Sequence, residues 1–400
     1  KIVIGDFPEE VLEKLDMTVL SPGVPTDLPV IEKMREQGIT VIGEVELAYQ
    51  FGKGDVLAIT GTNGKTTTTT LLGEIMKNYQ EDVFVVGNIG IPYTELCDTT
   101  DDDSDTVAEI SSFQLETVID FHPNVSAILN LTPDHLNRHY TFENYGNVKF
   151  SITKNQTMDD VTVLNYDDEH TRAMGEKAKD HCHVVYFSRL EKPAGGVYVE
   201  DGDIILEDGD KKINVLAIKD LKLMGAHNVE NVLAAVGISY YMGVPVDVIR
   251  DVATSFKAVA HRIEYVDTVD GVAYYNDSKG TNPDAAIKGI QAMVAPTFLI
   301  GGGYDKGSEY DEWIEAFDGK VKWLVLIGQT AQKIADCAKR HGFNSIIFEE
   351  NLQDAVAYCH ENAVDGDAVL LSPACASWGQ FDNYEQRGDM FKKYVRSYKE

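Results

Sequence analysis

Three things are scarce in this sequence: long apolar runs, paired cysteines and basic residues. No apolar run approaches the roughly 18 residues that a membrane-spanning helix needs. The five cysteines are scattered, with no Cys-x-x-Cys pair, which argues against a disulfide framework and favours a reducing cytosol. Only 35 Lys and Arg stand against 65 Asp and Glu, giving a net charge of −30. A chain this acidic repels phosphate backbones, which excludes sequence-independent binding to nucleic acid.

What is present is typical of a globular protein. Hydrophobic residues make up 44% of the 400 positions and charged residues 25%, so sizeable cores are expected and disorder is excluded as the main state. At roughly 100–200 residues per domain, this length predicts two to four domains. The sequence starts at Lys1 with neither a Met nor a secretory leader, so we expect its front to be trimmed or incomplete.

The order of short apolar runs and helical stretches predicts an α/β fold of three domains, 1–50, 51–258 and 259–400. The first has a helix over 28–37 and a strand over 39–42, too little for a complete doubly wound domain. The second alternates strands and helices, as a parallel sheet does, and ends in Gly-rich turns over 191–217 that predict antiparallel hairpins. The third returns to α/β alternation.

The sharpest local signal is a loop that follows a buried strand and opens a helix, with the sequence Thr60-Gly61-Thr62-Asn63-Gly64-Lys65-Thr66-Thr67. In that context small residues let backbone N–H groups surround phosphate oxygens, Lys65 adds a mobile cation, and the Thr66 hydroxyl can bind Mg²⁺. The strict phosphate-loop pattern fails, because Ile59 stands where its first Gly belongs. A strand–helix turn rich in small residues is the alternative, and nucleotide binding is favoured.

Further polar residues follow two other predicted strands. Glu109 comes after the strand 106–108, and Asp134 and His135 follow the strand that begins at Val125. The carboxyl ends of parallel strands form the ligand-binding edge of α/β sheets, so Glu109 and His135 are candidate metal ligands there. A His ligand is unusual for Mg²⁺, which prefers oxygen. The sequence His181-Cys182-His183 resembles a metal pair, but no further ligands surround it and a structural role is favoured.

Several long motifs, in order along the chain, resemble those of the Mur ligase family. They are residues 61–66, 87–90, 109–116, 129–135, 276–282 and 372–388. The blocks 111–116 and 372–388 resemble most closely the members of the family that add D-glutamate. The sequence departs from the family at its start, because the glycine-rich turn that binds uridine is absent.

The resemblance implies three α/β domains: an incomplete N-terminal substrate domain, a central parallel-sheet ATPase-like domain and a C-terminal Rossmann-like domain. It implies an ADP-forming ligase of peptidoglycan precursor synthesis that joins D-glutamate to UDP-N-acetylmuramoyl-L-alanine through an acyl phosphate. It also implies a cytoplasmic monomer that uses ATP and two Mg²⁺ ions and has small-molecule substrates, without nucleic-acid or membrane partners.

The resemblance also assigns roles to single residues. The implied catalytic residues are Lys65, Glu109, His135 and Lys149. The implied metal ligands are Thr66, Glu109, His135 and Lys149, the last as a carbamate formed from CO₂ and a neutral amine. From the sequence alone, Lys149 is expected to be an exposed helix lysine.

The remaining roles concern substrates. ATP is expected to contact the phosphate loop, Gly61, Thr62, Asn63, Gly64, Lys65, Thr66 and Thr67, and also Asn228, Asn231, Arg262, Asp277 and Lys279. The UDP-linked substrate is expected to contact Ser21, Pro22, Gly23, Asn88, Ser111 and Gln114. D-Glutamate is expected to contact Thr281, Lys306, Ser377, Trp378 and Tyr384. Trp378-Gly379 replaces the more usual Phe-Asp there.

Two alternatives stay open. One is a sibling ligase, either another Mur enzyme or a folylpolyglutamate-type enzyme, with a different amino acid as substrate. The other is a nucleotide-binding regulator that lacks ligase activity.

Overall fold

The computed structural model describes residues 5, 7–88, 91–223, 225–257 and 260–399. These residues form two compact units: the first joins Lys1–Leu221 to Asn228–Phe256, and the second joins Lys222–His227 to Lys257–Glu400. The predicted boundary at residue 258 lies outside the described residues. The predicted division at residue 50 falls inside the first unit and stays a prediction.

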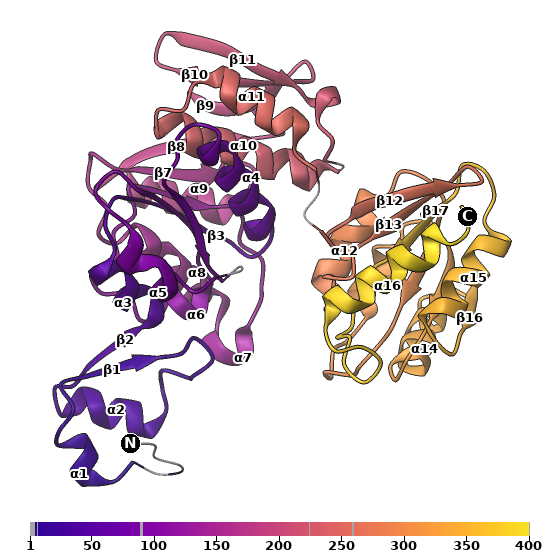
Figure 1. The fold of residues 1–400 in the computed structure, drawn as a ribbon, viewed down its shortest axis with the longest axis horizontal. Coiled ribbons are helices and arrows are strands. Elements are labelled where there is room, and N and C mark those ends of the chain that lie inside the picture. The colour runs from indigo at the N-terminus through magenta and orange to yellow at the C-terminus, as the bar shows by residue number, and fades with distance from the viewer. Residues whose placement is uncertain (1–4, 6, 89–90, 224, 258–259, 400) are drawn as a thin grey trace. The chain divides into compact units, whose positions relative to one another are not determined.

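The first unit begins with a small parallel pair of strands, β1 (Met17–Leu20) and β2 (Thr40–Gly43). Helices α1 (Glu9–Leu12) and α2 (Pro29–Glu36) accompany them (Figure 1). Their small core has five buried members, Leu12, Leu20, Ile31, Met34 and Ile39. Gly38 follows α2 with a φ of +78°, a left-handed conformation that ends the helix where the sequence predicts it.

A nine-stranded sheet is the centre of the first unit, in the order β11-β10-β9-β8-β7-β6-β3-β5-β4. The strands are β3 (Asp55–Thr60), β4 (Val83–Gly87), β5 (Asp105–Glu109), β6 (Val125–Ile128), β7 (Val161–Asn165), β8 (His183–Ser188), β9 (Gly196–Glu200), β10 (Asp203–Asp208) and β11 (Lys211–Ala217). Strands β3 to β9 pair in parallel, whereas β9, β10 and β11 form antiparallel hairpins, as the turns over 191–217 predict.

Helices of the first unit connect these strands and extend beyond them. They are α3 (Glu44–Phe51), α4 (Lys65–Lys77), α5 (Tyr93–Leu96), α6 (Ser112–Leu115), α7 (Leu136–His139), α8 (Phe142–Phe150), α9 (Glu169–Ala178), α10 (Ala226–Tyr241) and α11 (Val246–Ser255). Strand β3 lies between β5 and β6, so the loops that follow these three strands emerge together at one edge of the sheet. This edge is where the predicted site residues of the first unit begin.

The second unit has a six-stranded sheet in the order β12-β13-β17-β14-β15-β16, parallel except where β12 meets β13. The strands are β12 (Glu264–Val269), β13 (Val272–Asn276), β14 (Thr297–Gly301), β15 (Val321–Leu326), β16 (Ile346–Phe348) and β17 (Ala368–Leu371). The helices are α12 (Pro283–Ala292), α13 (Asp311–Glu315), α14 (Ala331–Arg340), α15 (Leu352–Asn362) and α16 (Tyr384–Arg396). The predicted α/β fold class is confirmed.

Helices cover both faces of this second sheet. Phe298 and Leu299 are neighbours on β14 but enter two different core clusters, since successive side chains of a strand point to opposite faces. Trp313 of α13 belongs to the cluster of Leu299, and Phe391 of α16 belongs to that of Phe298. These two helices therefore lie on opposite faces.

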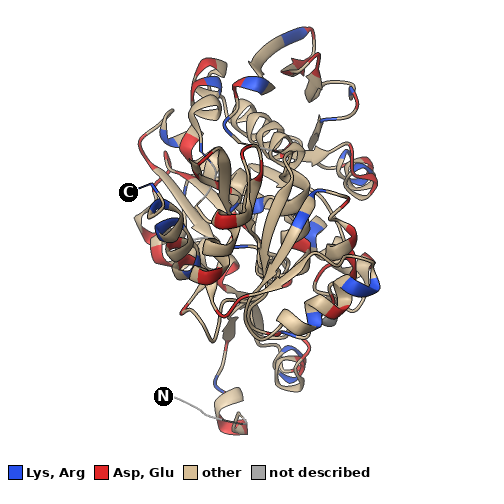
Figure 2. Ribbon diagram, turned by 90° about the vertical axis from the view of Figure 1, so that its right-hand side faces the viewer, with Lys and Arg blue, Asp and Glu red and all other residues tan. Residues whose placement is uncertain are grey.

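Acidic residues lie mainly on helices and loops (Figure 2), and the inner strands β6, β7, β14 and β17 carry no charged residue. The acidic residue Glu46 of α3 is buried. Its carboxylate accepts hydrogen bonds from the backbone N–H groups of Ile119, Asp120 and Phe121 at 2.8–3.0 Å. Among the helices that the structure describes, none is long and apolar enough to cross a membrane.

Candidate active site

The predicted phosphate loop connects β3 to α4. Gly61 has a φ of +141° and Gly64 a φ of +86°, both in the region that favours glycine. A Cβ atom on Gly64 would lie 2.2 Å from the side-chain oxygen of Asn231, so a larger residue there would have to displace that side chain. The loop therefore runs directly into the N-terminus of α4, where free N–H groups and the helix dipole favour an anion.

Asn130, just after β6, holds this loop in place. Its side-chain oxygen accepts a hydrogen bond from the Asn63 N–H at 2.8 Å, and its amide donates to the Asn63 carbonyl at 3.1 Å. The Thr62 hydroxyl contacts the hydroxyl of Tyr145 and the carbonyl of Thr132, both at 3.1 Å. Sequence reasoning included Asn130 in a family motif but gave it no role.

The charged and hydroxyl groups of the loop lie close to its backbone. Lys65 donates to the carbonyls of Gly61 and Thr62 at 2.9 Å each. Thr66 and Thr67 are buried in the first turn of α4. The residues predicted to bind ATP phosphates are therefore together in one strand–loop–helix segment.

Glu109 ends β5 beside this loop, paired in register with Ile59 of β3. One of its carboxylate oxygens accepts a hydrogen bond from the Asn88 amide at 2.8 Å, and its carbonyl accepts from the Asn88 N–H at 2.8 Å. The other oxygen, Oε2, is buried and has no hydrogen-bond partner among the described residues. A buried, unpartnered carboxylate oxygen beside a phosphate loop suits a Mg²⁺ ion, which prefers oxygen ligands.

Lys149 corrects the expectation of an exposed helix lysine, because its relative exposure is only 1%. It extends from α8 and donates to the Gly61 carbonyl at 2.9 Å and to the Thr60 hydroxyl at 3.3 Å. Burial lowers the pKa of Lys149 well below its usual range, and the charge of Lys65 lowers it further. Asp134 and Glu109 oppose that shift. The neutral amine is therefore easier to form here than on an exposed lysine.

His135 lies at the N-cap of α7 with a left-handed φ of +52°. Its side chain is 49% exposed, its Nε2 lies 3.4 Å from the Asp134 carboxylate, and its ring centroid lies 4.8 Å from that of Phe113. Within the described ranges, neither His135 nor Glu109 belongs to a trio of His, Cys, Asp or Glu side chains at metal-ligand spacing. Their shared role toward metal stays a prediction.

A cavity of about 660 Å³ lies in the first unit beside these groups. It is lined by Val19, Leu20, Ser21, Pro22, Glu44, Leu47, Gly87, Asn88, Pro92, Thr94 and Gln114. Four of the residues predicted to contact the UDP-linked substrate are in this wall, while Gly23 and Ser111 are not. Ser111 instead caps α6, where its hydroxyl and the Gln114 side chain satisfy each other's backbone N–H groups.

Two further residues predicted to contact ATP also lie near the phosphate loop. Asn228 and Asn231 are buried on one face of α10, and the Asn231 amide donates to the Asn228 oxygen at 3.1 Å. The close approach of Asn231 to Gly64 places this pair beside the loop.

In the second unit, Asp277 is fully buried at the end of β13. It accepts hydrogen bonds from the Ser372 hydroxyl at 2.7 Å and from the Ile263 N–H at 3.3 Å. Burial raises the pKa of Asp277 to about 6, and Arg262 is the main group that opposes this shift. The Arg262 Nε is buried and lacks a hydrogen-bond partner within the described part of the chain.

Arg387 of α16 lies in the motif 372–388, and the sequence assigns it no role. In the structure it organises the predicted substrate residues of the second unit. It is 1% exposed and donates to the Ser278 hydroxyl at 2.9 Å, the Ser278 carbonyl at 2.8 Å and the Cys375 carbonyl at 3.1 Å. The Ser278 hydroxyl in turn donates to the Tyr384 carbonyl at 2.8 Å. Arg387 thus holds two loop segments, those of Ser278 and Cys375, against α16.

The predicted D-glutamate residues form two local groups. The Lys306 ammonium lies 4.6 Å from the ring centroid of Trp378, which is also in edge contact with Tyr304. The Lys279 ammonium lies 5.8 Å from the ring centroid of Tyr384. Ser377 is buried next to Trp378, and the Thr281 N–H donates to the Lys279 carbonyl.

Comparison with known proteins agrees with these features. The family model described as Mur ligase middle domain matches residues 59–239, and the one described as Mur ligase, glutamate ligase domain matches residues 261–375. The phosphate loop and Glu109 lie in the first match, and Asp277 and Lys306 lie in the second.

Curated relatives match along the whole chain. The UDP-N-acetylmuramoylalanine--D-glutamate ligase of Lachnoclostridium phytofermentans is 54% identical over 399 residues, which cover 100% of this chain and 87% of the relative. The ligase of the same name from Clostridioides difficile is 50% identical over 400 residues, with 100% and 88% covered.

Solved structures show the same fold at low identity. The UDP-N-acetylmuramate-alanine ligase of Thermotoga maritima superposes with a TM-score of 0.65 at 19% identity, covering 96% of this chain and 85% of the other. The MurF ligase of Thermotoga maritima in complex with ADP gives 0.64 at 18% identity, with 96% and 97% covered. Because both family models match in order and relatives at 50–54% identity span its full length, this chain belongs to the Mur ligase family.

Proposed function

We propose that this chain joins the amine of D-glutamate to the carboxylate of UDP-N-acetylmuramoyl-L-alanine in peptidoglycan precursor synthesis, with hydrolysis of ATP to ADP and phosphate. Mur ligases are ATP-dependent, ADP-forming amide ligases, and relatives at 50–54% identity carry the name of this activity. The structural observation that carries the proposal is the position of Asn88, which lines the 660 Å³ cavity and also donates to Glu109. The substrate cavity therefore adjoins the phosphate-binding edge.

The chemistry accounts for the kinds of residues present. A carboxylate is a poor acyl donor, so its oxygen first attacks the γ-phosphorus of ATP, which releases ADP and leaves an acyl phosphate. The D-glutamate amine then attacks the acyl carbon, loses a proton, and inorganic phosphate departs with the C–O bonding pair. Both steps concentrate negative charge, which lysine ammonium groups and backbone N–H groups stabilise. Bound Mg²⁺ would supply further positive charge to the phosphate oxygens.

In the first unit, we assign the triphosphate to the phosphate loop and Lys65, the adenine to Asn228 and Asn231, and one Mg²⁺ to Thr66 and Glu109. The buried, unpartnered Oε2 of Glu109 supports its part in this assignment. His135 is assigned to a second Mg²⁺. Its exposed ring is free to approach a ligand at the same edge of the sheet.

We further propose that Lys149 is carbamylated. Its neutral amine would attack CO₂, form a C–N bond and release one proton, which converts a would-be cation into an anion suited to the second Mg²⁺. Burial and the low pKa of Lys149 support this step, because only the neutral amine reacts. The loss of the Nζ hydrogen bond to the Gly61 carbonyl is its structural cost.

In the second unit, we assign Arg262, Asp277 and Lys279 to ATP and Thr281, Lys306, Ser377, Trp378 and Tyr384 to D-glutamate. An amino acid with two carboxylates needs cations and hydroxyl donors, which Lys306 and Ser377 provide. We also propose that the enzyme works as a cytoplasmic monomer on small-molecule substrates alone. All five of its cysteines are free and buried, as suits a reducing compartment.

The decisive experiment measures phosphate release and the nucleotide-linked product with ATP, UDP-N-acetylmuramoyl-L-alanine and a panel of amino acids. We expect turnover with D-glutamate and none when either cosubstrate is omitted. A preference for L-lysine or meso-diaminopimelate would show a sibling ligase instead. ATP hydrolysis whose rate is independent of both the nucleotide sugar and D-glutamate would favour a nucleotide-binding regulator without ligase activity.

A further inference from the structure

A cluster of three potential metal ligands lies in the second unit, on the two helices that follow the Lys306 segment and β15. Asp311 opens α13, Cys337 lies in the last two turns of α14, and His341 is the C-cap of α14. Their ligand atoms, a carboxylate oxygen, a thiol sulfur and an imidazole nitrogen, all lie within 4.8 Å of one another. No role assigned above to ATP, D-glutamate or Mg²⁺ uses any of them.

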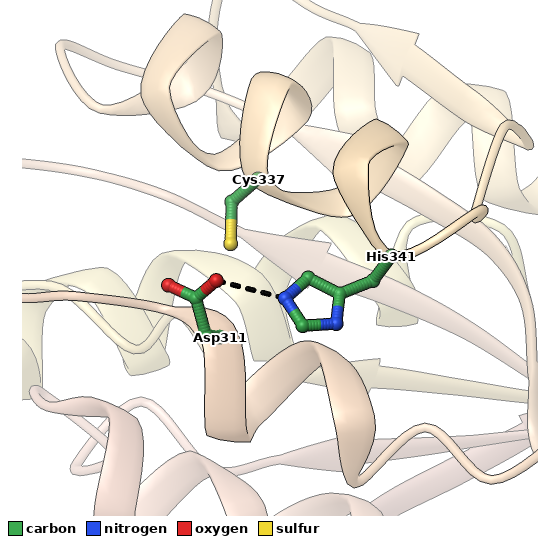
Figure 3. A group of neighbouring side chains, drawn as sticks. All are labelled: Asp311, Cys337 and His341. Atoms are coloured by element: carbon green, nitrogen blue, oxygen red, sulfur yellow. Dashed lines mark hydrogen bonds and ion pairs between the residues drawn. The ribbon is translucent and has the colours of Figure 1, made fainter.

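The arrangement follows from helical geometry. Cys337 and His341 are four residues apart, so they lie on the same face of α14, one turn after the other. The Cys337 sulfur points from α14 toward Asp311, and the His341 ring presents a nitrogen to the same carboxylate (Figure 3). The Asp311 oxygen and His341 Nε2 are 2.8 Å apart. Three donors from two helices thus converge on one point.

The donor set selects the kind of ion. Sulfur, imidazole nitrogen and carboxylate oxygen together suit Zn²⁺ or Co²⁺, whereas Mg²⁺ prefers oxygen alone. Zinc bonds of about 2.0–2.3 Å place tetrahedral ligand atoms about 3.5 Å apart. The Asp311 oxygen and His341 nitrogen, now 2.8 Å apart, would have to separate to that spacing, and all the ligand atoms already lie within 4.8 Å of one another.

The neighbouring charged groups favour the same reading. Glu315 lies 3.6 Å from the second ring nitrogen, Nδ1, of His341, on the side away from Asp311. A carboxylate behind the free nitrogen of a metal-binding histidine is common, because it orients the ring and makes the ligating nitrogen more basic. Arg340 also approaches Asp311, at 3.4 Å, but its side chain is 60% exposed and holds the carboxylate weakly.

We propose that Asp311, Cys337 and His341 bind one Zn²⁺-type divalent ion, with water as the fourth ligand, and that this ion clamps α13 to α14. Binding replaces the Asp311–His341 hydrogen bond and releases the thiol proton of Cys337 to solvent. The clamp adjoins the segment that carries Lys306: Lys333, one turn before Cys337, donates to the Ser308 carbonyl at 2.8 Å. The ion would therefore stabilise that segment without entering the reaction.

The test titrates the full chain with Co²⁺ in the presence of excess Mg²⁺, which occupies oxygen-only sites. We expect one equivalent of Co²⁺ to give a thiolate-to-cobalt absorption band, which added Zn²⁺ abolishes. Cys337→Ser should lose the band, and Cys359→Ser should keep it. Cys359 is the matched control, since it is equally buried on a helix of the same unit but lies outside the cluster.

Surface variants keep the test decisive if Cys337→Ser fails to fold. His341→Gln should weaken Co²⁺ binding at least 10-fold, while His360→Gln on α15 should leave it unchanged. Glu315→Gln should weaken binding about 10-fold through the orientation of the ring, and Glu312→Gln on the same helix should not. Absence of a thiolate band in the unmodified protein, a band that survives Cys337→Ser, or an unchanged Co²⁺ affinity in His341→Gln would overturn the proposal.

Discussion

The two units each bury a basic side chain, and they use that burial in opposite ways. Lys149 of the first unit and Arg387 of the second are both 1% exposed. Burial lowers the pKa of Lys149 well below its usual range, and the charge of Lys65 lowers it further, although two oxygen atoms accept hydrogen bonds from the amine. Burial also lowers the pKa of Arg387, but only to about 10, and its guanidinium donates hydrogen bonds to Ser278 and Cys375. Burial makes the lysine amine easier to deprotonate, so that it can react. The arginine stays charged and holds neighbouring loops in place through hydrogen bonds.

The largest expected effect concerns Lys149. Lys149→Ala should lower kcat about 1,000-fold, because it removes the one side chain proposed to become an anion beside the phosphate loop. Short carboxylic acids should restore part of the activity by occupying the vacated space. The exposed Lys154→Ala, a few residues along the chain, serves as the control and should retain full activity.

A direct readout separates carbamylation from a purely structural role of Lys149. With ¹³C-labelled bicarbonate, the unmodified protein should show a carbamate resonance that Lys149→Ala lacks. Full activity of Lys149→Ala, or no labelled carbamate in the active enzyme, would show that Lys149 has no chemical role. Lys149 and Arg387 would then both be structural residues.

The second prediction tests the structural role of Arg387. Arg387→Met should destabilise the second unit by about 4 kcal/mol, because it leaves buried oxygens of Ser278 and Cys375 unpaired and takes a positive charge away from Asp277. Denaturant unfolding followed by fluorescence measures this change. Arg396→Met on the exposed end of α16 should change stability by less than about 0.5 kcal/mol. Equal effects of the two substitutions would show that Arg387 only fills space.

The third prediction concerns Asp277, the buried carboxyl near Arg387. Its folded-state pKa of about 6 lies above the unfolded value of 3.8, so the folded protein binds more protons between these values. Its contribution therefore makes the folded state less stable as pH rises from about 4 to about 6, by on the order of 2 kcal/mol. Asp277→Asn should flatten this part of the stability profile, while the surface variant Asp318→Asn should preserve it. An unchanged profile in Asp277→Asn would mean that the carboxyl is ionised throughout.

Local sequence patterns predicted the phosphate loop but not which side chains are buried beside it. The strand–loop–helix signal located the phosphate loop, since every part of it is contiguous in sequence. Lys149 was expected to be exposed because lysine usually is. Its i, i+4 spacing from Tyr145 marks the buried face of α8, and that signal could have corrected the expectation.

Other site residues depend on contacts that no local pattern encodes. Arg387 reaches Ser278 across 109 positions, and Asp311 approaches Cys337 across two helices and a strand. The motif His181-Cys182-His183 offered metal-ligand residue types at close sequence spacing, yet Cys182 donates to the Ala178 carbonyl within its own turn. Convergence in space, rather than proximity in sequence, distinguishes a ligand set.

The smallest expected effect concerns Asn130, an uncharged side chain of the first unit that holds a loop in place. Asn130 does for the phosphate loop what Arg387 does for the second unit, but with two neutral hydrogen bonds to Asn63. Neutral hydrogen bonds contribute about 1 kcal/mol each, so Asn130→Ala, which loses two, should weaken ATP binding by up to about 30-fold and leave the unfolding transition of the second unit unchanged. Titration with a non-hydrolysable ATP analogue measures the loss, with Asn78→Ala at the far end of α4 as the control. If Asn130→Ala binds the analogue as tightly as the unmodified protein, the loop is held by its glycines and the Thr62–Tyr145 contact. Neutral hydrogen bonds would then contribute little to holding a loop in place, in contrast to the buried charge of Arg387.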